Sequence, residues 1–151
     1  MVLALTALGA LAQGNYIDAA GTVQTRKAEF LTVVNGASGA ITRGMAVCFD
    51  LTDDNGIHVD LCYAEGAKPV GIVTDLSCAV GARCKLQTKG YYAAGRFDYA
   101  ATATVAGGMI YADVDGDLTR PASVTTAMFP LGTTFDAVSA DSTALEIYID
   151  L

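Results

Sequence analysis

The chain has 151 residues and a formal net charge of −7, from nine Lys and Arg against 16 Asp and Glu, and 52% of its residues are hydrophobic. The scattered basic residues argue against a nucleic-acid partner and against membrane-surface binding, because both need clustered positive charge. Neither partner is expected. No run of about 20 apolar residues occurs, so no membrane-spanning helix is expected. The length fits one domain with its own core, and so apolar a composition is typical of a protein that contacts other protein.

Residues 1–25 are expected to form an N-terminal arm, and residues 26–151 a single β-domain. The glycines Gly9, Gly14 and Gly21 divide the arm into pieces too short to form stable helices in water. Its apolar side chains would be costly to leave solvated, which makes them candidate contacts with a partner protein. These candidates are Val2, Leu3, Leu5, Leu8 and Leu11.

The segment Ala10-Leu11-Ala12 before Gln13 resembles a signal-peptidase site. A secretory signal begins with a positively charged region, and no basic residue precedes Arg26. The segment is therefore interpreted as part of an arm and not as a signal peptide.

The stretch from Gly44 to Tyr63 predicts a β-hairpin around Asn55-Gly56. Only a three-residue loop, Asp54-Asn55-Gly56, keeps apolar side chains on one face of the hairpin, so this register is expected. The core face then pairs Val47 with Tyr63, Phe49 with Leu61 and Leu51 with Val59. The other face pairs Cys48 with Cys62, Asp50 with Asp60 and Thr52 with His58.

Further short strands separated by glycine-rich turns predict an all-β fold, a small sandwich or barrel of antiparallel strands with an extended N-terminal arm. The expected strands are Glu29–Asn35, Pro69–Val73, Ala82–Thr88, Met109–Asp113, Leu118–Arg120, Leu131–Val138 and Ala144–Asp150, with Gly81 and Gly90 as breaks. Short helical turns are expected only at Ala64–Lys68, Ser77–Gly81 and Tyr99–Val105.

A pattern in the first hairpin returns later in the chain. Gly44-Met45, an acidic turn and Pro69-Val70-Gly71 are matched by Gly108-Met109, an acidic turn and Pro130-Leu131-Gly132. Such spacing suggests two related β-units packed together, with chance matching of abundant Gly and Val as the alternative.

Four cysteines, Cys48, Cys62, Cys78 and Cys84, form no CxxC pair, which argues against structural zinc. Two interpretations remain. Free thiols buried as small apolar groups are the preferred one, and a Cys48–Cys62 cross-strand disulfide is the alternative that the hairpin register allows.

No constellation of catalytic residues is found, so the chain is expected to be neither an enzyme nor a cofactor or metal protein. The lone His58 is read as a solvated strand residue, since no nucleophile signature accompanies it. The run Asp113–Asp117 opens like a calcium loop, but the position that needs Glu is Val124, so a tight acidic turn is expected. The facing pair Asp50 and Asp60 is expected to be relieved by solvent, with a bound cation or a neighbouring basic side chain as alternatives.

Several short motifs resemble the capsid decoration, or cement, proteins of tailed bacteriophages over about residues 28–150. They are Ile41-Thr-Arg-Gly-Met-Ala-Val47, the Pro-Val-Gly-Ile-Val run within Glu65–Val73, Lys89-Gly-Tyr-Tyr92, Val105–Asp113 with Asp115-Gly116, and Pro130-Leu-Gly132. The chain departs from the family rhythm at Ala106-Gly107-Gly108, where Ala-Gly-Asp is common, and in its four cysteines.

The resemblance implies a virion protein on the outer surface of an icosahedral head, assembled in the host cytoplasm. Its implied partners are the major capsid protein and further copies of itself, most often in a homotrimer, with no small-molecule substrate. A secreted β-sandwich ligand-binding module is the alternative, although such modules usually carry aromatic platforms and this chain has no Trp.

Overall fold

The computed structural model describes residues 15–17, 23–25, 28–50, 52, 57–62, 67–99, 102–113, 115–124 and 128–151. Within these ranges the fold contains strands and no helix, so the all-β barrel prediction is confirmed. No helix among them is long and apolar enough to cross a membrane. The strands are β1 (Asn15–Ile17), β2 (Val23–Thr25), β3 (Glu29–Asn35), β4 (Ile41–Thr42), β5 (Ala46–Phe49), β6 (His58–Leu61), β7 (Pro69–Val73), β8 (Ser77–Cys78), β9 (Arg83–Phe97), β10 (Met109–Ala112), β11 (Leu118–Thr119), β12 (Pro130–Thr134) and β13 (Ser142–Asp150).

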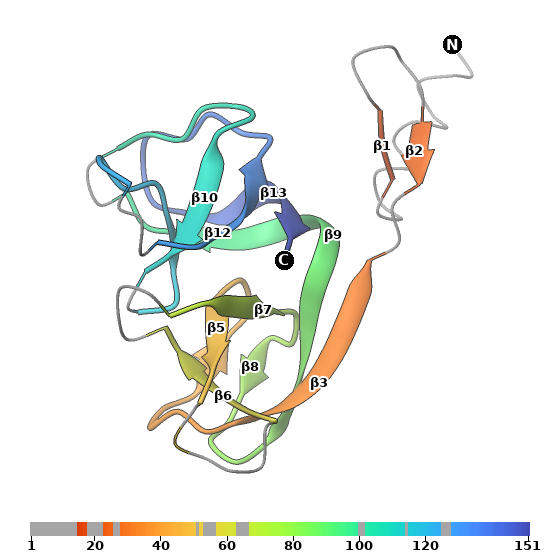
Figure 1. Ribbon diagram of the computed structural model, residues 1–151, viewed down its shortest axis with the longest axis vertical. Coiled ribbons are helices and arrows are strands. Elements are labelled where there is room, and N and C mark those ends of the chain that lie inside the picture. The colour runs from red at the N-terminus through yellow and green to blue at the C-terminus, as the bar shows by residue number, and fades with distance from the viewer. Residues whose placement is uncertain are drawn as a thin grey trace.

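The 15-residue strand β9 organises the molecule, because it belongs to two closed rings of strands at once. One ring runs β9-β3-β6-β5-β7 and returns to β9; we call it barrel 1. The other runs β9-β13-β12-β10-β11 and also returns to β9; we call it barrel 2. Figure 1 shows β9 passing from the β5, β6 and β7 group to the β10, β12 and β13 group. Strands β1 and β2 pair only with each other, and β4 pairs with β8.

Barrel 2 repeats the topology of barrel 1. In each barrel one strand lies between the next two strands along the chain and pairs antiparallel with both; we call it the middle strand. In barrel 1 it is β5, between β6 and β7, and in barrel 2 it is β10, between β11 and β12. The first strand of each barrel pairs parallel with the third, as β3 does with β6 and β9 does with β11. The last strand of barrel 1 is therefore the first strand of barrel 2, which explains how two barrels share one long strand.

The repeat extends to individual residue pairs. Val47 pairs with Gly71 in barrel 1 and Ile110 with Gly132 in barrel 2, and in both barrels the register then shifts before a proline, Pro69 or Pro130. The sequence pattern around Gly71 and Gly132 thus marks a structural repeat, as the first of its two interpretations held. The other matched pair is off by one residue, because Gly44-Met45 corresponds to Gly107-Gly108 and not to Gly108-Met109.

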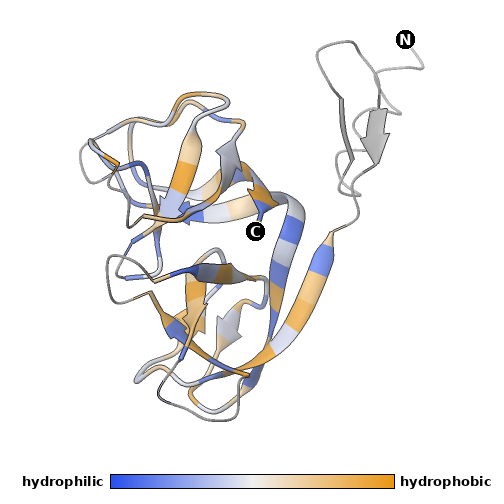
Figure 2. Cartoon of the chain, viewed as in Figure 1, coloured by the Kyte–Doolittle hydropathy of each residue, from blue (hydrophilic) through white to orange (hydrophobic). Residues whose placement is uncertain are grey.

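Each barrel has its own apolar core. Val33, Val47, Val59, Val73 and Leu86 belong to the first cluster. Phe97, Ile110, Leu131, Leu145 and Ile147 belong to the second. Ala46 and Ile72, from strands of barrel 1, are buried in the second cluster and therefore join the two barrels. Figure 2 shows the alternation of apolar and polar residues along the strands that produces this arrangement.

The expected hairpin register is wrong by two residues. Val47 pairs with Leu61, Cys48 with Asp60 and Phe49 with Val59. A shift of two keeps each side chain on its face, so the polarity pattern alone does not separate the two registers. The ladder between β5 and β6 ends at Asp50, because the Asp50 carboxylate accepts hydrogen bonds from the backbone N–H and the hydroxyl of Thr52. Phe49 is consequently 42% exposed at the strand end, and Asp50 does not face Asp60.

Two local predictions also fail. Gly90 does not end a strand, since β9 continues through it with a positive φ of 96°. Ser77 and Cys78 form the short strand β8 and not a helical turn, because they pair with Thr42 and Ile41.

Candidate functional site

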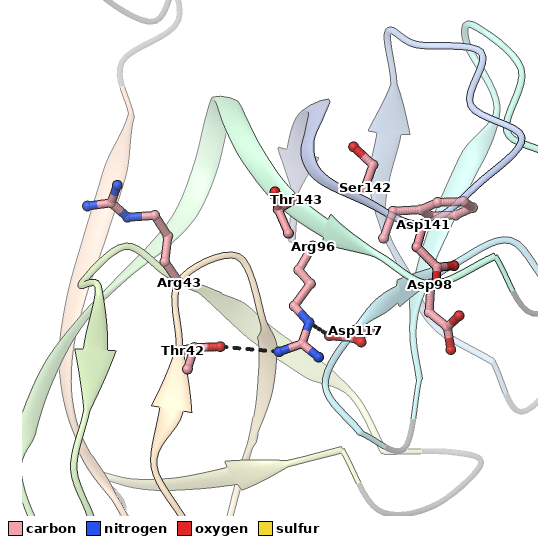
Figure 3. A pocket seen from close by; sticks show the side chains of 9 residues that line it. Thr42, Arg43, Arg96, Asp98, Asp117, Asp141, Ser142 and Thr143 are labelled. Atoms are coloured by element: carbon pink, nitrogen blue, oxygen red, sulfur yellow. Dashed lines mark hydrogen bonds and ion pairs between the residues drawn. The ribbon is translucent and has the colours of Figure 1, made fainter.

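A cavity of about 500 Å³ lies where barrel 1 meets barrel 2. Its lining comes from the turn before β5, the C-terminal end of β9, the β10–β11 turn and the start of β13. Figure 3 shows Arg43 and Thr42 on one side and the carboxylates of Asp98, Asp117 and Asp141 on the other.

Arg96 connects the two sides of this cavity. Its Nε lies 2.8 Å from Oδ1 of Asp117 in an ion pair, and its Nη1 donates a 3.4 Å hydrogen bond to Oγ1 of Thr42. The Arg96 backbone N–H also donates to the Gly44 carbonyl at 3.1 Å. Arg96 therefore joins barrel 2 to the turn that begins β5, which is a structural role.

The carboxylates around Arg96 are held in a crowded acidic environment. Burial raises the pKa of Asp117, the Arg96 charge opposes that rise, and Asp98, Asp115 and Asp113 reinforce it. Desolvation also raises the pKa of Asp98, with the Asp141 charge as the next cause. The Asp141 carboxylate accepts the Tyr99 backbone N–H at 2.9 Å, which fixes it beside Asp98.

This cavity lacks the parts of a catalytic site among the described residues. Its hydroxyls, on Thr42, Ser142 and Thr143, have no histidine beside them, because His58 lies on β6 outside the lining. No group of three or more acidic, His or Cys side chains among the described residues is arranged to hold a metal ion. The cavity therefore lies at the joint between the two barrels, where Arg96 holds their sides together.

The acidic run singled out in the sequence is a tight turn. The Gly116 N–H donates to the Asp113 carbonyl, and the Asp113 N–H donates to the Asp117 carbonyl at 2.7 Å. This turn places the Asp117 carboxylate in its ion pair with Arg96, and it places the Gly116 carbonyl where it accepts the Ala46 N–H of β5. Sequence reasoning singled out Asp117 only as part of the acidic run and did not pair it with Arg96, since their meeting depends on the closure of barrel 2.

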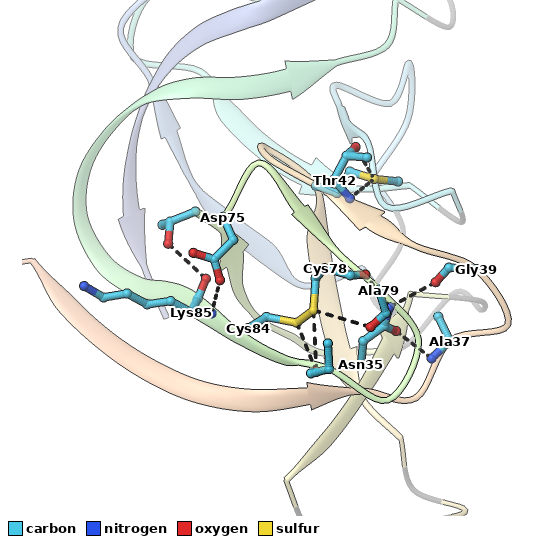
Figure 4. The surroundings of a disulfide bond; sticks show 12 residues. Asn35, Ala37, Gly39, Thr42, Asp75, Cys78, Ala79, Cys84 and Lys85 are labelled. Atoms are coloured by element: carbon cyan, nitrogen blue, oxygen red, sulfur yellow. Dashed lines mark hydrogen bonds between the residues drawn. A yellow bond between two sulfur atoms is a disulfide. The ribbon is translucent and has the colours of Figure 1, made fainter.

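The preferred interpretation of the cysteines as free thiols is wrong. Cys48 and Cys62 form a disulfide, so the alternative cross-strand pair is the one present, and Cys78 and Cys84 form a second. Both lie in barrel 1, and their four residues are buried. Figure 4 shows the second disulfide beside Asn35, whose amide donates to the Gly39 and Cys78 carbonyls. This cluster fixes the turns at one end of barrel 1.

The candidate partner contacts Val2, Leu3, Leu5, Leu8 and Leu11 lie outside the described residues. Of the expected arm, the structure describes only β1 and β2, which pair Asn15 with Thr25 and Ile17 with Val23.

Comparison with known proteins identifies a family model and similar solved structures. The family model described as phage cement protein matches residues 23–151. Among solved structures, the chain is similar to the N base of head fiber gp8.5 in bacteriophage phi29, with a TM-score of 0.52 and 14% sequence identity over 82% of this chain and 94% of that one. At this identity the likeness is one of fold. No curated protein matches the sequence.

Proposed function

The chain belongs to the phage cement protein family and is thus a structural protein of the phage virion; on that basis we propose that it decorates the outer surface of an icosahedral head. In this role it binds the major capsid protein and stabilises contacts between neighbouring capsid subunits. It is a homotrimer, assembled in the host cytoplasm, with no enzymatic activity. The family match carries the proposal, because it spans both barrels.

Two features of the molecule support this proposal. Its described surface exposes large apolar side chains, among them Met109 at 56% and Phe30 at 48%, as expected of a subunit that works against other protein. Its two disulfides suit a virion surface, which meets an oxidising environment once particles leave the cell. The disulfides would equally suit a secreted ligand-binding module, but the family match favours the virion role.

The arm is the proposed contact with the major capsid protein. Its five apolar side chains, Val2, Leu3, Leu5, Leu8 and Leu11, could contribute several kcal/mol per copy at about 25 cal/mol per Å² of buried apolar area. Part of that gain is lost to the entropy of ordering the arm. Repetition over many copies on a shell restores the total.

Co-sedimentation with expanded heads that lack this protein tests the proposal. The full chain should sediment with the heads, and a chain without residues 1–25 should remain in the supernatant while retaining its β-rich circular dichroism spectrum. A full chain that does not sediment with the heads would contradict the decoration role. A shortened chain that is unfolded would show that residues 1–25 belong to the core.

A further inference from the structure

Barrel 1 uses one face to contact barrel 2. On this face the Gly44 carbonyl accepts the Arg96 N–H at 3.1 Å, and the Ala46 N–H donates to the Gly116 carbonyl at 2.6 Å. Contact is so close that a β-carbon on Gly44 would collide with the Ala94 carbonyl oxygen. Ala46 is fully buried there.

Barrel 2 has the same face, built by the same hydrogen bonds. In barrel 1 the Met45 N–H donates to the Thr42 carbonyl and the Gly44 N–H to the Val73 carbonyl. In barrel 2 the Gly108 N–H donates to the Val105 carbonyl and the Gly107 N–H to the Thr134 carbonyl. Gly107, with φ 79°, therefore occupies the place of Gly44, with φ 86°.

This face of barrel 2 is uncovered in the described part of the chain. Among the described atoms, nothing lies within 4 Å of a β-carbon built on Gly107. Three residues of barrel 2 stand on this face: Val105, Met109 and Phe135, with 47%, 56% and 40% of their surface exposed. We call these three residues the open face. The residues at the equivalent positions of barrel 1 are Thr42, Ala46 and Thr74, in the same order. In barrel 1, Thr42 and Ala46 meet barrel 2, through the Arg96 guanidinium and the Gly116 carbonyl. Larger apolar side chains stand at the equivalent positions of barrel 2, which marks a contact surface.

The strand that covers this face of barrel 1 belongs to barrel 2, and barrel 1 has a strand at the equivalent place in its own repeat. The cover is the C-terminal half of β9, the first strand of barrel 2, and the first strand of barrel 1 is β3. On one side β3 pairs with β9 from Glu29 to Val34, but on the other β6 pairs only with Val34 and Asn35. No described strand pairs with that side of β3 before Val34.

The uncovered part of β3 is equipped for docking. Phe30 is 48% exposed and Leu31 39%, on opposite faces of the strand. The Val34 N–H points toward β6, where it donates to the Ile57 carbonyl, so the Thr32 N–H points the same way at the unpaired edge. We call Phe30, Leu31 and Thr32 the β3 edge. An edge of this kind accepts contacts from another chain.

A cation lies beside the β3 edge, together with the acidic residues Glu29 and Asp75, whereas the charged residues beside Phe135 of the open face are carboxylates. The Lys85 ammonium lies 4.1 Å from the centre of the Phe30 ring. Beside Phe135, the Asp136 carboxylate accepts a hydrogen bond from the Glu146 backbone N–H. In barrel 1 the Asp75 carboxylate accepts the Lys85 backbone N–H in the same way. Glu146 therefore occupies the place in barrel 2 that Lys85 occupies in barrel 1. The β3 edge therefore carries a cation where the open face carries carboxylates.

We propose that the open face of one copy binds the β3 edge of a second copy, so that the contact between barrel 1 and barrel 2 is repeated between chains. The occupant is a second copy because the contact continues one that already exists within the chain. This inference rests on the self-association in the proposed function and names its surfaces. Since the two surfaces differ, the contact is head to tail, which is the arrangement that a closed ring such as the proposed homotrimer requires.

Sedimentation velocity of the full chain, without heads, tests this contact. The wild type should sediment as an assembly, and Met109→Asp and Leu31→Asp should each sediment as single chains of 15.5 kDa. Leu76→Asp is the matched control, because Leu76 is more exposed than either residue but lies on neither surface, and should keep the wild-type mass. Circular dichroism should show all three variants folded.

Mixing the two single-chain variants tests the head-to-tail arrangement. Met109→Asp keeps an intact β3 edge and Leu31→Asp keeps an intact open face, so their mixture should form a two-chain species. A mixture that remains as single chains would overturn the proposal, as would a monomeric wild type or a Met109→Asp variant of wild-type mass. Head binding is measured separately, so a wild type that binds heads but never self-associates would overturn this contact and leave the decoration role standing.

Discussion

Gly71 and Gly132 lie at the same place in the two barrels, each against the backbone of the neighbouring antiparallel strand. A β-carbon on Gly71 would lie 2.7 Å from the Gln87 carbonyl oxygen, and one on Gly132 would collide with the Tyr148 carbonyl oxygen. Both glycines follow a proline by two residues and pair with the middle strand of their barrel. The Pro-x-Gly pattern therefore records a close approach of strands in both halves of the repeat.

Replacing Gly132 with Ala should destabilise the protein by about 1–3 kcal/mol, because the added methyl group meets rigid backbone and not a movable side chain. Gly39→Ala is the control, since no described atom lies within 4 Å of its β-carbon. Urea denaturation of both variants gives the free energies of unfolding. Equal stabilities would contradict the close packing at Gly132.

Phe49→Ala should cost about 1 kcal/mol or less, since Phe49 is 42% exposed at the end of β5. Phe97→Ala is the comparison, because Phe97 is 2% exposed in the barrel 2 core and its truncation should cost about 3–5 kcal/mol. Thermal unfolding followed by circular dichroism separates the two. A large loss at Phe49 would favour the register expected from sequence over the one described here.

Removing the Cys48–Cys62 disulfide by the double change to Ala should lower the free energy of unfolding by about 3 kcal/mol, as expected for a closed loop of this length. Urea denaturation in the absence of reductant measures the loss. The matched treatment is reduction of the wild type, which removes Cys78–Cys84 as well and should lower stability further. Unchanged stability on reduction would show that neither bond is present.

The stability of the protein should depend on the protonation of Asp117. Burial raises the pKa of this carboxyl above 3.8, so folding takes up a proton there, and the free energy of unfolding falls as the pH rises from 3.8 through the raised pKa. Asp98, whose pKa is also raised, acts in the same direction. Asp117→Asn should flatten this fall in urea denaturation series across the acidic range. A variant with the wild-type pH profile would rule out Asp117 as its source.

The sequence was sufficient for the parts of the fold that depend on local pattern. Alternating runs such as Pro69–Val73 and turns such as Asp115-Gly116 follow from side-chain period and turn chemistry, and the matching glycines indicated the repeat. The hairpin register was not accessible, because a two-residue slip preserves the polarity of both faces, so the pattern of the two strands fits either register.

The ion pair between Arg96 and Asp117 was not accessible from sequence either. Arg96 and Asp117 are separated by β10 along the chain, and only the closure of barrel 2 onto β9 brings them within 2.8 Å. The continuation of β9 through Gly90 was also not predicted, since a glycine at a positive φ can either end a strand or bend it. The disulfides likewise depend on which strand ends meet in space.

The most direct test of the decoration role is the heat stability of expanded heads with and without this protein. Heads lacking it should be disrupted at a lower temperature than heads to which the purified full chain has been added, as followed by release of packaged DNA to a fluorescent dye. The chain without residues 1–25 should give no such protection. Heads that bind the full chain but break at the same temperature as undecorated heads would contradict the claim that it stabilises the capsid.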